Sequence, residues 1–500
     1  ASCQGPFRER VKRETTPQGT IEYQYDAAGR RISMRPSSQE GIQYKYDDSN
    51  QLTQLIHPTL GTFLIDYDEA GRRKSLIFPN GIVANHTYDD ASRLLAINYV
   101  KGSTSIRNVS YAYDANYNRI TSDTTNSQTL LPDAMVATYN AANQILTFKD
   151  KSFTYDKNGN MTSMTDSTGT TLYTWDARDR LIAIDGPLIT ATFKYDAVNK
   201  RIEKTINGRS IQYLYDGVDI ISEIEGSLIT RTYPRSLNID EAFARIDSNG
   251  VTYYLLDASR STLGLTDETG AITTIYTYDS FGNTSLTGDP EDNPFQFTGR
   301  ENDGTGLYYY RARYYSPELQ RFISKDPIGF AGGDVNLYRY VWNNPINFRD
   351  SSGLAAFFWH GIISLTAGLA EGRGWEQSSQ MAWDSMLRDK GTQGAEPSNT
   401  NIHGMSGWDT ALRRFQSPEE AITGANKIIE AEAKCGRHGN AMHTVQDLEF
   451  FWHAGQKWEG NNPLKNPLAI PHFILDVNPP VGELWNAFQA SRQYLRQQGR

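Results

Sequence analysis

Short runs in which apolar or aromatic residues alternate with polar ones recur along the first two thirds of the chain. Side chains two positions apart, such as Tyr23 and Tyr25, lie on one face of a strand, so this alternation predicts strands with one buried face. The Asp-x-x-Gly or Asp-x-x-Asn stretch that follows favours a tight turn. A run such as Arg30–Ile32 then begins a return strand. The pattern therefore predicts a series of β-hairpins.

The hairpin unit repeats with a period of about 20 residues. An aspartate follows the aromatic end of the first strand in each unit, and these aspartates are Asp26, Asp47, Asp68, Asp89, Asp114, Asp156, Asp176, Asp196 and Asp216. One hairpin cannot bury its own apolar face, whereas stacked hairpins cover one another, so we expect an extended β-sheet built by repetition. Residues 230–290 depart from the strict pattern, although YYLLDASRS and YTYDSFGN still fit it loosely.

The composition agrees with a strand-rich fold. The 500 residues include 29 tyrosines and 41 glycines, and 38% of the chain is hydrophobic, which is typical of strands and turns rather than of a helical enzyme. The net charge of −9 gives no general basic field, so broad electrostatic capture of nucleic acid is not indicated. The two cysteines, Cys3 and Cys435, lie in unrelated regions, so we expect free thiols and no disulfide framework.

The ends of the chain carry no visible targeting segment. No basic, apolar leader follows Ala1, and we expect the chain to be the downstream part of a longer polypeptide on which any export signal would lie. The longest mostly apolar run, Ala355–Ala370, is shorter than the ~20 residues that span a bilayer, and we interpret it as a buried helix.

The repeats resemble the YD repeats of the Rhs family, which also occur in insecticidal toxin-complex proteins and in teneurins. The segment from 296, QFTGRENDGTGLYYYRARYYSPELQRFISKDPIGFAGGDVNLYRYVWNNPINFRDSSGL, is similar to the Rhs core segment. This resemblance implies a hollow β-shell over residues 1–295 that encloses cargo. It further implies a core segment over residues 296–354 that cuts the chain and releases a variable C-terminal domain.

The core segment is expected to carry an aspartyl-protease-like site. The resemblance assigns the catalytic pair to Asp326 in SKDPIG and Asp350 in RDSSGL, and it places the cut between Leu354 and Ala355. Two close carboxylates suit this chemistry because their apparent pKa values separate, so that one holds a proton while the other activates water. The second motif has Ser351 where the family usually has proline.

Two alternatives for these residues stay open at this stage. Arg311 or Arg313, in RARYY, would orient the carboxylates or the scissile carbonyl. Alternatively, Asp326 and Asp350 only cap turns, as aspartate before proline or serine commonly does.

Residues 355–500 have a different character and are expected to form a separate domain. Six of the eight histidines lie there, and apolar residues at helical spacing occupy 359–388, 417–434, 440–453 and 481–497. The fold class expected from the whole sequence is therefore multidomain, with a repetitive β-sheet shell of hairpins followed by a mainly α-helical C-terminal domain.

The C-terminal domain contains a candidate metal centre. His443 and Asp447 are spaced i, i+4 and share a helix face, as do His472 and Asp476, while His453 follows ten residues after His443. This constellation is similar to that of zinc-dependent phospholipases C and related zinc nucleases. The resemblance implies up to three zinc ions, held by a full set of ligands comprising His443, Asp447, His453, His472, Asp476, Asp389, His403, His360 and the amino terminus at Ala355. The alternative is that these are packed or surface histidines and solvated carboxylates.

The resulting prediction is an Rhs-type toxin that is secreted or delivered into target cells. Its shell would enclose its own C-terminal domain, a zinc phosphodiesterase of phospholipase C type that acts on phospholipid. The alternatives are a zinc nuclease that acts on nucleic acid, a non-enzymatic adhesion scaffold, and a membrane-permeabilising protein. The family also implies an immunity protein and a secretion apparatus as partners.

Overall fold

The computed structural model describes residues 11–125, 130–131, 136–289, 292–332, 334–354, 408–409, 414–415 and 427. Within these ranges nearly all regular structure is antiparallel β-sheet, and each strand pairs with its neighbours in sequence. The repeats therefore form meanders of hairpins, as their local pattern predicts.

The first sheet has eleven strands. They are β1 (Arg13–Thr16), β2 (Gly19–Tyr25), β3 (Arg31–Pro36), β4 (Ile42–Tyr46), β5 (Leu52–His57), β6 (Gly61–Tyr67), β7 (Arg73–Ile77), β8 (Ile82–Tyr88), β9 (Leu94–Lys101), β10 (Thr104–Tyr113) and β11 (Arg119–Thr124).

The second sheet has sixteen strands and includes the region where the repeat pattern weakens. They are β12 (Ala137–Tyr139), β13 (Ile145–Phe148), β14 (Lys151–Tyr155), β15 (Met161–Asp166), β16 (Gly169–Trp175), β17 (Leu181–Asp185), β18 (Thr190–Tyr195), β19 (Arg201–Ile206), β20 (Arg209–Asp216), β21 (Asp219–Glu225), β22 (Leu228–Thr232), β23 (Ala244–Asp247), β24 (Gly250–Leu256), β25 (Thr262–Thr266), β26 (Ile272–Tyr278) and β27 (Thr284–Gly288).

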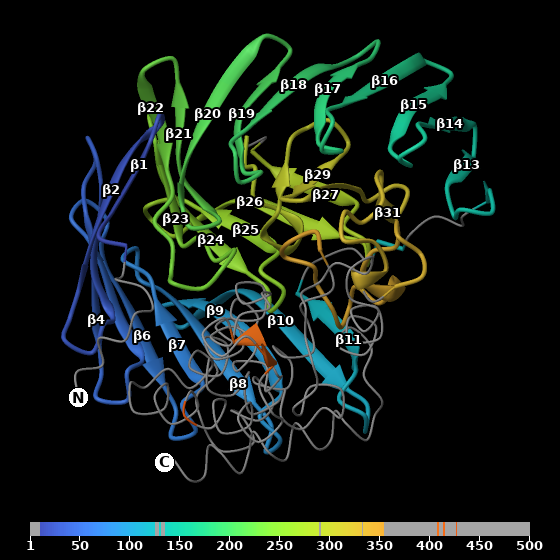
Figure 1. Cartoon of the computed structure of the whole chain (residues 1–500). Helices are drawn as coiled ribbons and strands as arrows, with labels where there is room; N and C mark the ends of the chain where they lie inside the picture. The colour runs from blue at the N-terminus through green and yellow to red at the C-terminus, as the bar shows by residue number, and fades with distance from the viewer. Residues whose placement is uncertain are drawn as a thin grey trace.

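A third, four-stranded sheet follows in the segment that closes the repeats. It contains β28 (Glu301–Asn302), β29 (Tyr308–Tyr310), β30 (Arg313–Ser316) and β31 (Arg321–Phe322), accompanied by the 3₁₀ helices η1 (Phe297–Gly299), η2 (Gly329–Gly332) and η3 (Val341–Asn343). In Figure 1 this yellow to orange segment lies inside the arc traced by the green strands of the second sheet.

Each repeat turn is built by its aspartate, and Asp89 is a clear example. The Asp89 amide donates to the Arg93 carbonyl (3.0 Å), and the Ser92 amide donates to the Asp89 carbonyl (2.9 Å). Carboxylate Oδ1 accepts from the amides of Ala91 (3.0 Å) and Arg93 (2.8 Å), while Oδ2 accepts from Arg93 Nε (2.6 Å). The same aspartate–arginine pair occurs in other hairpins, namely Asp26–Arg30, Asp68–Arg72 and Asp176–Arg180.

The fourth residue of these turns is left-handed. Its φ angle is 78° at Gly29, 62° at Ser92 and 68° at Asn199. Glycine adopts this conformation without steric cost, and asparagine tolerates it better than most residues. The backbone geometry thus explains the recurring Asp-x-x-Gly or Asp-x-x-Asn sequence.

The tyrosine before each aspartate ties its hairpin to the preceding one. The ladder between β6 and β7 shifts register between Asp66 and Tyr67, opposite Arg73. The hydroxyl of Tyr88, from the next hairpin, donates to the Arg73 carbonyl at 3.0 Å. The Arg72 guanidinium lies over the same ring, 4.6 Å from its centroid. Equivalent hydroxyl–carbonyl bonds join Tyr46 to Arg31, Tyr67 to Leu52 and Tyr195 to Leu181.

The two large sheets share one apolar core. Side chains from the first sheet, such as Phe63 and Phe78, pack against Phe243 and Tyr253 of the second. A buried ion pair crosses the same interface, because Arg73 Nη1 lies 2.6 Å from Glu241 Oε1. The stacked hairpins are therefore locked to one another across the core as well as along each sheet.

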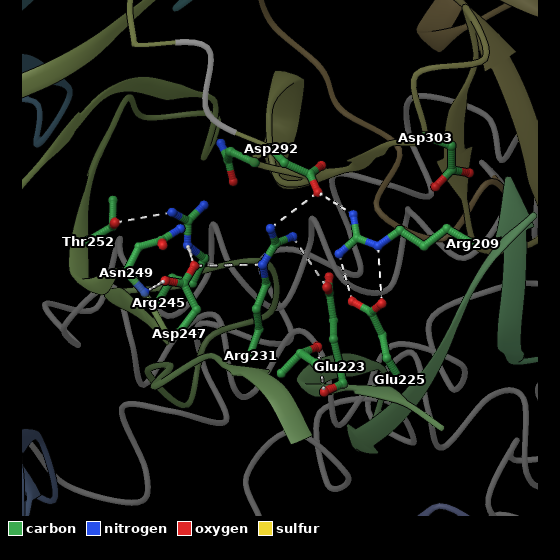
Figure 2. Close-up of polar contacts among 12 residues, drawn as sticks. Arg209, Glu223, Glu225, Arg231, Arg245, Asp247, Asn249, Thr252, Asp292 and Asp303 are labelled. Atoms are coloured by element: carbon green, nitrogen blue, oxygen red, sulfur yellow. Dashed lines mark hydrogen bonds and ion pairs between the residues drawn. The ribbon is translucent and has the colours of Figure 1, made fainter. Parts of the chain in front are cut away.

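Ion pairs fasten the closing segment to the second sheet. The Asp303 carboxylate forms ion pairs with both Arg201 and Lys204, and the side chains of Arg201 and Asp303 are fully buried. Figure 2 shows a further contact of the second sheet, in which Asp292, between β27 and η1, binds Arg209 (3.0 Å) and Arg231 (3.2 Å). The pairs of Asp303 thus fasten the start of the segment that contains Asp326 and Asp350.

The expected α-helical C-terminal domain requires correction. In the described chain beyond residue 354 the regular elements are two short paired strands, β32 (Trp408–Asp409) and β33 (Arg414–Phe415), and among the described residues there only Lys427 is helical. The segments at 359–388, 417–434, 440–453 and 481–497 lie outside the described residues, apart from Lys427. Apolar spacing over short windows does not by itself separate strand from helix, which is why the prediction was wrong.

The run Ala355–Ala370 and both cysteines also lie outside the described residues. None of the helices in the described ranges has the length and apolar character that crossing a bilayer requires.

The turn geometry predicts a graded response to substitution at Asp89. Asp89→Asn keeps an oxygen that accepts from the turn amides, whereas Asp89→Ala removes it. We expect Asp89→Ala to destabilise the hairpin by about 1–2 kcal/mol and Asp89→Asn by at most about 1 kcal/mol. Hydrogen–deuterium exchange of peptides from 84–100 would then rise most in the alanine variant.

The pH dependence provides the control. Burial alone would raise the pKa of Asp89, but the hydrogen bonds and charge of Arg93 lower it below its ordinary value. The carboxylate therefore stabilises the hairpin above about pH 4, and this stabilisation is lost as pH falls through the lowered pKa. The difference in hydrogen–deuterium exchange between the wild type and Asp89→Asn should therefore become smaller in acid. A difference that became larger would contradict the role given to the Asp89 carboxylate.

Candidate active site

The core segment brings its two candidate carboxylates to one buried arginine. Arg313, in β30, is 2% exposed, and its Nη2 atom lies 2.9 Å from Asp326 Oδ2 and 3.4 Å from Asp350 Oδ2. Both aspartates are also buried. The Arg313 guanidinium rests on the Phe322 ring, 3.6 Å from its centroid. Two residues distant in sequence thus share a single cation.

The electrostatics of this cluster couple its members. Burial lowers the pKa of Arg313, and the charges of Asp326 and Asp350 oppose that shift. Arg313 is thus a cation that both carboxylates share.

Residues 351–353 lie along residues 311–313 in a fixed register. Arg311 Nη1 donates to the carbonyl of Ser351. The Ala312 amide donates to the Ser352 carbonyl at 3.1 Å, and Arg313 Nε donates to the carbonyl of Gly353 at 2.6 Å. Three successive carbonyls are thus bound by three successive residues, which sets the position of Leu354.

Gly353 is required by this register. Its φ is +70°, and a Cβ atom there would collide with the carbonyl oxygen of Tyr310 and lie 3.1 Å from the Arg313 amide nitrogen. Only a residue without a side chain fits between these backbone atoms.

The Asp350 carboxylate contacts the backbone on both sides of Gly353. Its Oδ1 atom accepts from the amides of Ser352 (3.2 Å) and Leu354 (3.1 Å). Asp326 Oδ1 similarly accepts from the Ile328 amide at 3.1 Å. Both aspartates therefore cap turns with Oδ1 and face Arg313 with Oδ2. The same two side chains thus act as turn caps and also lie as a pair at one arginine.

Arg311 anchors the register to the shell. Its Nη2 atom lies 2.6 Å from Asp240 Oδ1 and 3.0 Å from Asp219 Oδ1. Burial would raise the pKa of Asp240, yet Arg300 and Arg311 hold it at about 2. Asp240 therefore stays ionised and retains Arg311, which binds Ser351.

A small cavity of about 10 Å³ lies beside Asp326, and its lining includes Arg313, Gly332 and Trp342. This is close to the room that one water molecule needs. A Cβ atom at Gly332 would lie 2.7 Å from Asp326 Oδ2, so the absence of a side chain there leaves space for the carboxylate.

The remaining predicted site residues lie outside the described residues. They are Ala355, His360, Asp389, His403, His443, Asp447, His453, His472 and Asp476. Within the ranges the structure describes, no cluster of three or more histidine, cysteine, aspartate or glutamate side chains is arranged to hold a metal ion. The zinc centre therefore stays a prediction.

Sequence reasoning missed several residues that shape the site. Asp219 and Asp240 hold Arg311 although both are distant from the aspartate motifs in sequence, and Gly332, six residues after Asp326, packs on that carboxylate. The sequence indicated Arg311 and Arg313 in RARYY without separating their roles.

Comparison with known proteins places the fold. The model of the family described as Teneurin YD-shell matches residues 8–88 and 83–346. The crystal structure of TcdB2-TccC3-Cdc42 aligns with a TM-score of 0.52 and 18% sequence identity, over 68% of this chain and 22% of that chain. At this identity the likeness concerns the fold alone.

Two curated relatives share about half of this chain. The tRNA3(Ser)-specific nuclease WapA of Bacillus spizizenii is 33% identical over 260 residues, which are 49% of this chain and 11% of WapA. The double-stranded DNA deaminase toxin A of Burkholderia cenocepacia is 27% identical over 267 residues, which are 46% of this chain and 19% of the toxin. The matches thus span a small part of each relative.

The family model covers the hairpins of both large sheets and nearly all of the core segment, up to residue 346. The chain belongs to the teneurin YD-shell family.

Proposed function

We propose that this protein is an Rhs-type toxin whose β-shell encloses residues 355–500 and whose core segment cuts the chain between Leu354 and Ala355. The observation that carries the proposal is the shared contact of Asp326 and Asp350 with Arg313, which also binds the carbonyl of Gly353. A carboxylate pair, a cation and the predicted cleavage segment therefore lie together.

The proposed reaction is hydrolysis by general acid–base catalysis. One carboxyl group takes a proton from water, and the water oxygen attacks the carbonyl carbon of Leu354. The bond to the nitrogen of Ala355 breaks, and the protonated carboxyl supplies a proton to the departing amine. The cavity beside Asp326 has about the volume of the water required.

We further propose three functional regions. Residues 1–295 form the shell, residues 296–354 form the cutting segment, and residues 355–500 form the cargo. The closed apolar core between the two sheets and the ion pairs of Asp303 support a rigid container. An immunity protein and a secretion apparatus are proposed partners, together with delivery into target cells.

The cargo is proposed to be a nuclease toxin. The relatives named above are a tRNA nuclease and a DNA deaminase toxin, so both act on nucleic acids. These names favour the nuclease alternative over the phospholipase C that was first expected. The proposed zinc ligands are those of the sequence prediction, and bound zinc would supply a hydroxide and neutralise phosphate oxygens.

The first test replaces each carboxylate. Asp326→Asn and Asp350→Asn should each slow cutting by at least about a hundredfold, because an amide cannot exchange the required proton. Electrophoresis and mass spectrometry of the purified chain would measure the cut fraction and locate the new ends. Asp176→Asn, which removes an ion pair in a distant hairpin, is the control and should be cut normally. Normal cutting of both aspartate variants would contradict the catalytic role of the pair, and a wild-type chain that is not cut would support the adhesion-scaffold alternative.

The second test disturbs the register at Gly353. Gly353→Ala should stop cutting, because its Cβ atom collides with the backbone of residue 310. Gly226→Ala is a matched control, since Gly226 also has a positive φ (64°) but a Cβ atom there meets open space. Both variants place an alanine at a backbone position with positive φ, but only Gly353→Ala brings its Cβ atom into collision with a neighbouring backbone atom. Equal cutting of both would show that the register is not needed.

The third test concerns the cargo. The product comprising residues 355–500 would be incubated with tRNA, duplex DNA and phospholipid vesicles, with zinc or with a chelator. We expect breakdown of nucleic acid that the chelator abolishes and zinc restores. Hydrolysis of phospholipid alone would restore the phospholipase C prediction, and activity that survives chelation would exclude the zinc centre.

A further inference from the structure

We propose that the hydroxyl of Ser352 is a catalytic hydrogen-bond donor to the scissile carbonyl oxygen of Leu354. This inference rests on the proposed self-cleavage and deepens it. It adds a group that touches the reacting atoms and that is neither of the two aspartates nor one of the two arginines.

The geometry around the hydroxyl is specific. Ser352 Oγ lies 3.0 Å from the carbonyl oxygen of Leu354 and 3.1 Å from its amide nitrogen. It also lies 3.1 Å from Asp350 Oδ1. The side chain therefore contacts the scissile peptide group and one of the paired carboxylates at once.

The donor capacity of the hydroxyl limits the possible arrangements. A serine hydroxyl carries one proton and two acceptor lone pairs. The Leu354 amide donates to Oγ, which uses one lone pair. The single proton is then directed either to the Leu354 carbonyl or to Asp350 Oδ1.

The other hydrogen bonds of these two acceptors indicate that the Ser352 hydroxyl proton is directed to the Leu354 carbonyl. Asp350 Oδ1 already accepts from the Ser352 amide, and it shares the Leu354 amide proton with Ser352 Oγ. Arg313 Nε binds the carbonyl of Gly353, one residue before the scissile bond. Among the described residues, Ser352 is the group that donates to the Leu354 carbonyl.

The contribution to the reaction follows from charge development. When water attacks the carbonyl carbon of Leu354, the carbonyl oxygen gains negative charge, and a donor already aimed at it stabilises that state more than the ground state. The hydroxyl proton stays on Ser352 throughout. Water supplies the hydroxyl of the new carboxyl group, and its other proton passes through the carboxylate pair to the departing amine of Ala355.

The backbone holds the side chain in place without using its hydroxyl. The Ser352 carbonyl accepts from the Ala312 amide, and the Ser352 amide donates to Asp350. Replacement of the hydroxyl therefore leaves both main-chain contacts available. This separation makes a clean substitution experiment possible.

The test compares Ser352→Ala with two other variants in the full chain. Cell-free synthesis with quenching at intervals would give the first-order rate of cutting over a range of pH. Ser352→Ala should slow cutting by about a hundredfold, the usual effect of removing one such donor. The pH profile should not shift, since the carboxylate pair is unchanged. Ser352→Thr, which keeps a hydroxyl, should restore most of the rate.

Ser110→Ala is the matched control, because Ser110 lies in β10 of the first sheet, where its hydroxyl donates to the Asp123 carbonyl. It should be cut at the wild-type rate. Thermal unfolding of the uncut Asp326→Asn chain, with and without Ser352→Ala, would measure any purely structural effect. Equal transition temperatures are expected.

Three outcomes would overturn the assignment. Cutting of Ser352→Ala at the wild-type rate would show that the hydroxyl is idle, and a large fall in transition temperature would show that it only stabilises the turn. A shifted pH profile would show that the hydroxyl donates to Asp350 instead. Absence of cutting in the wild type would refute the proposed self-cleavage itself, a result that is distinct from the other three.

Discussion

The structure depends on the way in which one hairpin holds the next. An aspartate such as Asp89 closes its own turn through two backbone amides and an arginine, while the preceding tyrosine donates to a carbonyl of the hairpin before it. The carboxylate gives the backbone amides of the tight turn a hydrogen-bond acceptor. The tyrosine hydroxyl gives a hydrogen-bond donor to a carbonyl that lies beside a register shift in the strand pairing. Because every step joins neighbours in sequence, the sheet extends by local contacts.

This local construction also explains how a precise site is held by a repetitive scaffold. The core segment supplies β30 and the motif aspartates, but Asp219 and Asp240 of the second sheet hold Arg311 in place. A separate buried pair, Arg201 with Asp303, fastens the start of the same segment. Removing one partner from such a pair leaves a buried charge uncompensated, which is strongly unfavourable. The second sheet and its loops therefore position the candidate active site.

The sequence predicts those features that local chemistry determines. The hairpins follow from the alternation and from the left-handed fourth position of each turn, as at Gly29 and Ser92. The division into two sheets is not visible in the repeat, and neither is the fit of Gly353 against residue 310, because both depend on contacts between distant segments. The pairing of Asp326 with Asp350 came from resemblance, since spacing alone does not distinguish it from turn capping. The helical prediction beyond residue 354 failed because apolar spacing lacks that same tertiary information.

In the proposed reaction the substrate is already bound before chemistry begins. The chain from Asp350 to Leu354 is covalently part of the site, and its register is fixed by Ala312 and Arg313, so no binding step has to be completed. The cut would add a third carboxylate, at Leu354, to a buried cluster whose two aspartates share one arginine. Mutual repulsion of these charges opposes rejoining of the ends. The same crowding of carboxylates that would activate water would therefore also make the cut irreversible, which suits a site that acts once per chain.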